Sequence, residues 1–67
     1  MTTLHTFVAA IAAARVTGTD VEVETLVLTR IRASNHADAD AQALARALVT
    51  WPEGKGWTGH VAVAVLG

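Results

Sequence analysis

The sequence predicts a small α+β domain of the order β-β-α-β, with one helix packed on one face of a three-stranded sheet. Residues 21–33 and 59–66 alternate β-branched with other side chains, which is the period of a strand. Residues 35–50 repeat apolar side chains at the period of a helix. A chain of 67 residues has room for one hydrophobic core, so we expect residues 1–67 to form a single domain.

The first segment, residues 3–15, fits two structures. Leu4, Phe7 and Ile11 lie on one stripe of a helix, and alanine, which is frequent here, is the best helix former. Residues 15–23, however, have the pattern of a hairpin turn, in which Gly18 supplies the backbone freedom that a tight turn needs. A helix would also leave only two strands for the whole sheet. We therefore expect a strand, and keep the order α-β-α-β as the alternative.

One register of the hairpin supports the strand. If Val16 lies opposite Val21, the opposite charges of Arg15 and Glu22 meet. The same register opposes three further pairs: Ile11 with Leu26, Ala10 with Val27, and Val8 with Thr29. Opposed residues of opposite charge or of apolar character stabilise neighbouring strands. The pattern therefore predicts that residues 3–15 pair antiparallel with residues 21–33.

The helix is expected from about Asn35 to Thr50. Ser34 is a suitable N-cap, and the carboxylates of Asp38 and Asp40 match the positive end of the helix dipole. Pro52 and the glycines after it end the helix. We expect the stripe that docks on the sheet to be Ala37, Ala41, Leu44, Ala45 and Leu48. The opposite face then carries His36, Asp40, Ala43 and Ala47, with Arg46 alongside.

One helix covers only one face of such a sheet, so the other face is left apolar. We expect the helix on the face with the smaller side chains: Val8, Ala10, Ala12, Ala14, Val16, Val21, Val23, Val27 and Ile31. The opposite face has an apolar centre and a charged rim, which is typical of an interface. The candidate interface residues are Phe7, Ile11, Leu26, Leu28, Arg30 and Arg32. In the alternative arrangement the helix covers this second face and leaves the valines exposed.

Composition narrows the function classes. Charged residues make up 16% of the chain, against about 25% in a typical domain, and the net charge is −1. Phosphate binding needs several cations without nearby carboxylates, and here the acidic and basic residues are interspersed. We therefore do not expect nucleic acid as a partner, although a nucleic-acid-associated accessory domain remains an alternative.

No membrane segment, disulfide or cofactor is expected. The uncharged run of residues 1–14 is shorter than the roughly 20 apolar residues that span a bilayer, and no basic stretch precedes it. The chain has no cysteine, which excludes disulfides and thiolate metal sites. We expect a cytoplasmic protein without a cofactor.

The segment HADAD, residues 36–40, is the candidate metal site. His36 and Asp40 are four apart and share a helix face, so together they could hold a divalent ion. Asp38 points elsewhere and leaves the pair without a third ligand. We therefore interpret the segment as the dipole-matched first turn of the helix, and predict no metal site and no catalytic residue.

The loop of residues 50–60 is the second candidate site. Trp51 and Trp57 flank Lys55, and tryptophan is a frequent anchor of binding surfaces. The competing interpretation, which we favour, places both rings in a core that has only one phenylalanine.

The function that these patterns favour is a small non-catalytic interaction module. Its partner is a second copy of the chain or another, larger protein, bound through the uncovered apolar sheet face. Size alone also suggests a small protein of a phage or mobile element that occludes a host protein, without support from particular residues.

Overall fold

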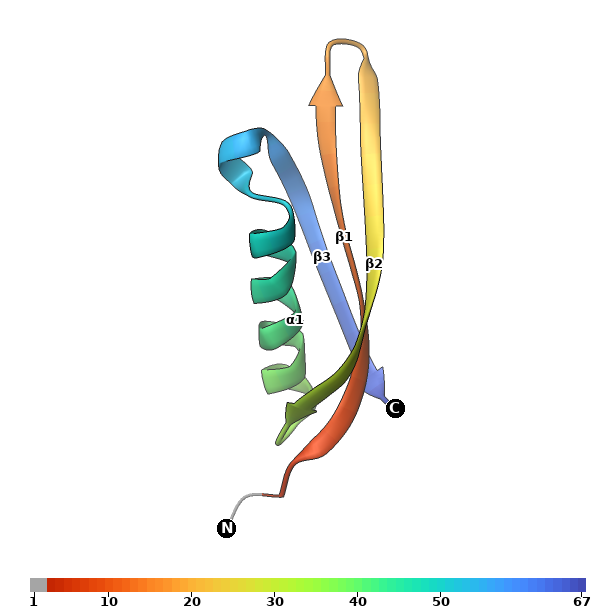
Figure 1. The fold of residues 1–67 in the computed structure, drawn as a ribbon, viewed down its shortest axis with the longest axis vertical. Coiled ribbons are helices and arrows are strands. Elements are labelled where there is room, and N and C mark those ends of the chain that lie inside the picture. The colour runs from red at the N-terminus through yellow and green to blue at the C-terminus, as the bar shows by residue number, and fades with distance from the viewer. Residues whose placement is uncertain (1–2) are drawn as a thin grey trace.

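The fold is β-β-α-β, as predicted. The computed structural model describes residues 3–67. Its elements are β1 (His5–Thr17), β2 (Asp20–Ala33), α1 (His36–Thr50), the short 3-10 helix η1 (Glu53–Lys55) and β3 (Trp57–Leu66). The strands form one antiparallel sheet in the order β2-β1-β3, and α1 lies along one face of it (Figure 1). The alternative with a helical first segment is wrong, because most of that segment belongs to β1.

The β1–β2 hairpin closes with a turn of two residues, Gly18 and Thr19. Gly18 has a φ of 64° and precedes Thr19, which lacks a positive φ, so the turn has the type II′ pattern. The register is the predicted one from Thr17 opposite Asp20 as far as Ala9 opposite Leu28. The turn, which needs glycine at this position, thus fixes which residues of the two strands meet.

The predicted register ends at a bulge in β2. Ala9 pairs with Leu28, but Phe7 pairs with Ile31, so β2 has one residue more than β1 in this interval. Arg30 lies in the bulge and has a φ of 60°, the left-handed conformation that bulges commonly contain. Since side chains alternate between the two faces of the sheet, one extra residue moves every later side chain of the strand to the face opposite the predicted one. Ile31 therefore packs against the core beside the helix, and its prediction on the valine-rich face is wrong.

A second bulge lies in β3. Ala12 pairs with Val61 and Ala14 with Thr58, so β3 has one extra residue opposite β1, and Gly59 has a φ of 63° there. The strand begins at Trp57, two residues earlier than the predicted range of 59–66. The early start places Trp57 opposite Arg15, whose guanidinium carbon lies 4.6 Å from the centre of the indole ring.

The helix docks with alanines. Ala39, Ala43 and Ala47 are fully buried, whereas Leu44 and Leu48 remain partly exposed, so the predicted docking stripe is wrong. Small side chains let the helix backbone approach the sheet closely. The sheet contributes further small residues to the same core: Ala9, Ala13, Ala33 and Ala64. The larger volumes in this core are those of Phe7, Ile11, Trp51 and Trp57.

The N-cap of the helix lies one residue later than predicted. Asn35, and not Ser34, is the N-cap, and its Oδ1 accepts a hydrogen bond of 2.8 Å from the backbone N–H of Asp38. At an N-cap, asparagine and serine satisfy a free amide of the first turn equally well. The sequence alone therefore did not show which of these two neighbouring residues is the cap. At the other end the N–H of Trp51 donates to Ala47 O.

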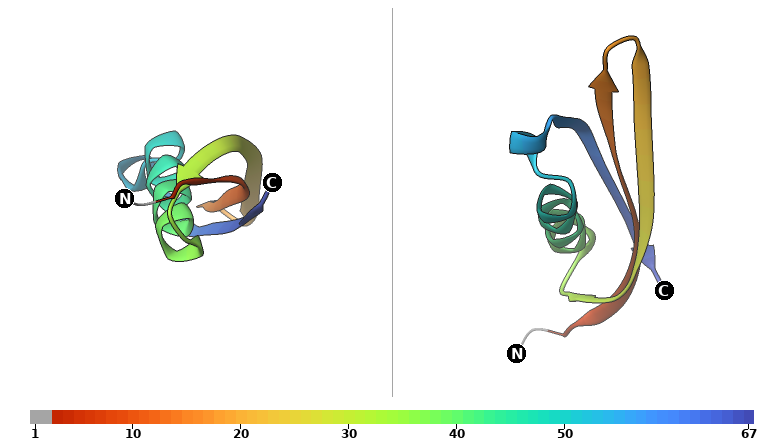
Figure 2. Two further views of the ribbon diagram at one scale, coloured as in Figure 1. Left: turned by 90° about the horizontal axis from the view of Figure 1, so that it is seen from below. Right: turned by 45° about the horizontal axis from the view of Figure 1, so that its top comes forward.

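The chain is elongated. Its radius of gyration is 13.4 Å, and its principal extents are 50 × 19 × 14 Å. A compact domain of this length has a radius of gyration of about 11 Å. The excess comes from the β1–β2 hairpin, which extends beyond the end of α1, and from the sheet face that no element covers (Figures 1 and 2). Among residues 3–67 no helix is long and apolar enough to cross a bilayer.

Candidate functional site

The predicted interface residues do not all lie on an open surface. Phe7 and Ile11 are each 1% exposed, because α1 packs over the face that was predicted to be uncovered. That part of the prediction is wrong. Strict alternation marks two apolar faces but does not identify the one beneath the helix. Here the large side chains fill the space between sheet and helix, and the smaller valines face outward.

The other four predicted interface residues lie along β2. Leu26 is 47% exposed, on the helix side of the sheet, and Leu28 is half-buried against the core. Arg30 and Arg32 are exposed, and both line a groove beside the helix together with Leu28. The structure therefore brings Leu28, Arg30 and Arg32 together at the β2 edge of the sheet, apart from the buried Phe7 and Ile11.

The uncovered face of the sheet, which we name the valine face, consists of alternate residues of all three strands. Its members are Val8, Ala10, Ala12, Ala14, Val16, Val21, Val23, Thr25, Val27, Thr58, Val61, Val63 and Val65. Seven of these valines are between 53% and 68% exposed. Two charged residues, Arg30 in the bulge and Arg32 opposite Thr6, border this face on the same side of β2. None of the residues that define the valine face is charged, and these two arginines stand at its margin.

The tryptophan loop is part of the core. Trp51 is 3% and Trp57 is 6% exposed, and their ring centroids are 6.3 Å apart. His60 Nε2 lies 2.7 Å from Trp51 O, and the Arg15 guanidinium covers Trp57. The interpretation of both rings as core is confirmed. Their use as recognition anchors is wrong, because both rings are almost fully buried, and exposed Lys55 is therefore not flanked by exposed rings.

The HADAD segment is scaffold. His36 packs edge-on against Phe7, with ring centroids 5.0 Å apart. Asp40 Oδ1 accepts a hydrogen bond of 3.0 Å from the backbone N–H of Ala64 in β3. Asp38 Oδ2 accepts a 3.3 Å bond from Gln42 Nε2. The three polar side chains of the segment thus each have a structural partner, and His36 and Asp40 make two different contacts.

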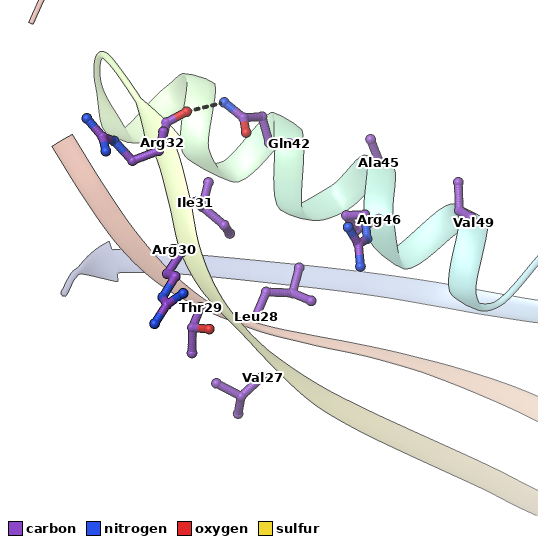
Figure 3. Close-up of a pocket in the computed structure, with 10 residues that line it drawn as sticks. All are labelled: Val27, Leu28, Thr29, Arg30, Ile31, Arg32, Gln42, Ala45, Arg46 and Val49. Carbon is purple, nitrogen blue, oxygen red and sulfur yellow. Dashed lines mark hydrogen bonds between the residues drawn. The ribbon is translucent and has the colours of Figure 1, made fainter. Parts of the chain in front are cut away.

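A groove of about 780 Å³ lies between the edge of β2 and α1 (Figure 3). β2 contributes the continuous run of residues 27–32. The helix contributes Gln42, Ala45, Arg46 and Val49, which form one stripe at helical spacing. Gln42 Nε2 also donates a 2.9 Å bond to Arg32 O and so closes one end of the strand edge. The groove is a channel with a strand on one side and a helix stripe on the other.

The lining of the groove contains basic but no acidic residues. Three of its lining residues are arginines, namely Arg30, Arg32 and Arg46, and none is acidic. The ion pair within residues 3–67 is that of Arg15 with Glu22, so none of the three groove arginines has a carboxylate partner there. Sequence reasoning found Arg30 and Arg32 but missed Arg46. The helical spacing of Arg46 from Gln42 and Val49 indicated that these three share a face, but not that this face borders β2.

Comparisons with protein-family models, curated protein sequences and solved structures found no significant match to this chain.

Proposed function

We propose that the chain is a non-catalytic self-association module, which buries its valine face against the valine face of a second copy. The observation that carries this proposal is the valine face itself, in which seven valines lie more than half exposed and whose charged neighbours, Arg30 and Arg32, lie at its margin. An apolar surface of this kind on a small domain is an aggregation risk unless a partner covers it.

A second copy suits this surface better than a charged partner does. A charged side chain buried against the valine face would have no counter-ion and would lose its hydration. A second valine face brings only apolar and threonine side chains, and two such faces can pack about 10 Å apart as in a β-sandwich. A two-fold axis makes the same patch serve both copies, which is the commonest symmetry of soluble oligomers.

The total surface supports association. A chain of 7.0 kDa that folds compactly exposes about 4,000 Å². This chain exposes 4539 Å². Each valine that passes from its present exposure to full burial contributes on the order of 1 kcal/mol, so a face with seven of them holds enough area to stabilise a dimer.

The test is a pair of aspartate substitutions in β3. Val63 lies on the valine face and is 57% exposed, whereas Leu66 lies on the helix side of the same strand and is 60% exposed. Analytical ultracentrifugation should give a wild-type mass above 7.0 kDa at submillimolar concentration. Val63→Asp should lower that mass while the far-ultraviolet circular dichroism stays unchanged. Leu66→Asp should leave the mass as in the wild type.

Two outcomes would overturn the proposal. One is a wild-type chain that sediments as a monomer throughout this concentration range, which would leave the valine face to a different protein. The other is an assembly whose mass is equally insensitive to Val63→Asp and Leu66→Asp, which would place the contact elsewhere on the chain.

A further inference from the structure

The outer edge of β2 is an open hydrogen-bonding edge. Thr17 and Asp20 flank the two-residue turn as a bonded pair, and bonded pairs then alternate along an antiparallel ladder. Val21, Val23, Thr25 and Val27 therefore direct their N–H and C=O groups away from β1. None of these groups has a hydrogen-bond partner within residues 3–67. Such a row of free groups is a template for another strand.

The sequence of β2 complements itself about Val27. Leu26 is matched by Leu28 and Thr25 by Thr29, and the two members of each pair lie on the same face of β2. On the same spacing Glu24 is matched by Arg30 and Glu22 by Arg32 in the sequence, but the bulge places both arginines on the valine-face side of β2 while both glutamates lie on the helix side. Antiparallel pairing of this strand with its own copy therefore places leucine against leucine and threonine against threonine beside the axis. In-register parallel pairing would instead place glutamate against glutamate.

We propose that β2 of a second copy adds antiparallel to β2, with the two-fold axis at Val27. The two sheets then join into one of six strands, with both helices on the same side and the two valine faces continuous. The inference rests on the proposed function in one respect, since it also takes the partner to be a second copy. The contact is a different one, made by the strand edge and the groove.

The groove accommodates the apolar side chains of the added strand. Leu26 and Leu28 lie on the helix side of β2. In this register Leu26 of the second copy lies directly opposite Leu28, at the mouth of the groove that Ala45 and Val49 line from the helix. The added strand therefore covers the exposed side chain of Leu26.

Charge complementarity selects the same partner. Glu24 lies on the helix side of β2 and has no ion-pair partner within the described residues. The antiparallel arrangement carries the Glu22–Glu24 segment of the second copy past the three groove arginines. The bulge turns Arg30 to the side of Val27 and Thr29, whereas Arg46 extends from α1 toward the strand (Figure 3). Arg46 is therefore the cation that Glu24 of the second copy meets on the helix side.

The test is cysteine cross-linking, because the chain has no cysteine of its own. Leu26→Cys and Leu28→Cys are made in separate chains that also carry Val63→Asp, which removes the valine-face contact. In the proposed register the two positions form a non-bonded pair with Cα atoms about 4.5 Å apart, within the range of a disulfide. Under mild oxidation the mixture of both chains should form a disulfide-linked dimer at least about tenfold faster than either chain mixed with Leu66→Cys.

Equal cross-linking rates for all mixtures, in chains with unchanged circular dichroism, would overturn the inference. If Leu28→Cys fails to fold, Thr25→Cys and Thr29→Cys test the same register at two exposed positions. The two proposals fail separately. An assembly mass unaffected by Val63→Asp, together with rapid cross-linking, excludes the valine-face contact alone. A mass lowered by Val63→Asp with no preferred cross-link excludes the strand-edge contact alone.

Discussion

The backbone N–H of Ala64 donates a 3.0 Å hydrogen bond to Asp40 Oδ1 and so ties the outer edge of β3 to the helix. A carboxylate on an edge amide prevents another strand from pairing there. At the opposite edge of the sheet Gln42 Nε2 donates a hydrogen bond to Arg32 O, near the end of β2. The groups from Val21 to Val27 have no such cover. The helix thus blocks the β3 edge at Ala64 and leaves the β2 edge from Val21 to Val27 open.

Asp40→Ala should destabilise the fold by about 1–2 kcal/mol, because the amide of a buried residue loses a charged acceptor. The measurement is urea unfolding followed by circular dichroism, at one fixed protein concentration because association raises apparent stability. Asp40→Asn keeps an oxygen in the same position and should lose less than half as much. Equal losses for both variants would mean that the hydrogen bond is not the source of the effect.

Ala43→Leu should destabilise the fold by about 1–3 kcal/mol, because Ala43 is fully buried between helix and sheet and extra methyl groups must push them apart. Ala41→Leu adds the same groups at an exposed position of α1 and should change the free energy of unfolding by less than about 0.5 kcal/mol. Thermal unfolding of the two variants checks the difference. Similar melting temperatures would show that the helix does not dock through its alanines.

Arg30→Gly and Arg32→Gly should change the free energy of unfolding by different amounts or in opposite directions. Arg30 has a φ of 60°, which costs a residue with a side chain on the order of 1 kcal/mol, and glycine removes that cost. Arg32 lies in ordinary strand conformation, where glycine should destabilise by about 0.5–1 kcal/mol. Both changes delete one groove cation, so the difference between them isolates the backbone. Equal destabilisation in urea unfolding would contradict a strained bulge.

Charge reversal tests the electrostatics of the proposed strand-edge contact. Glu24→Arg and Arg46→Glu should each weaken association in the Val63→Asp background. Each change gives positions 24 and 46 of opposite copies the same charge, and the two-fold axis repeats this contact. An equimolar mixture of the two should recover the dimer, because all contacts between unlike chains are again attractive. Sedimentation equilibrium measures the three samples, and the effect should shrink at high salt.

Two exposed residues of η1 supply the controls for this experiment. Glu53→Arg and Lys55→Glu change the net charge by the same amounts at a distance from β2 and should leave association as in the Val63→Asp parent. If the controls weaken the dimer as much as Glu24→Arg and Arg46→Glu do, net charge and not local pairing governs the association.

The sequence determined the elements and much of their pairing. Alternation marked the strands, and Gly18 with the opposed Arg15 and Glu22 set the hairpin register that the structure contains as far as Leu28. The helix followed from its period. These features are local, because turn geometry, side-chain alternation and helical spacing depend on residues close together in the chain.

The tertiary structure decided which surfaces are buried. Both sheet faces are apolar, and both stripes of the helix contain alanines, so no local pattern selected Ala39, Ala43 and Ala47 or placed Phe7 beneath them. The choice rests on how the volumes of Phe7, Ile11 and the two tryptophans fill the space that close helix packing leaves. The bulge at Arg30 has the same origin. One extra residue turns Ile31 toward the core, and that gain depends on a helix that lies nearby only in the folded chain.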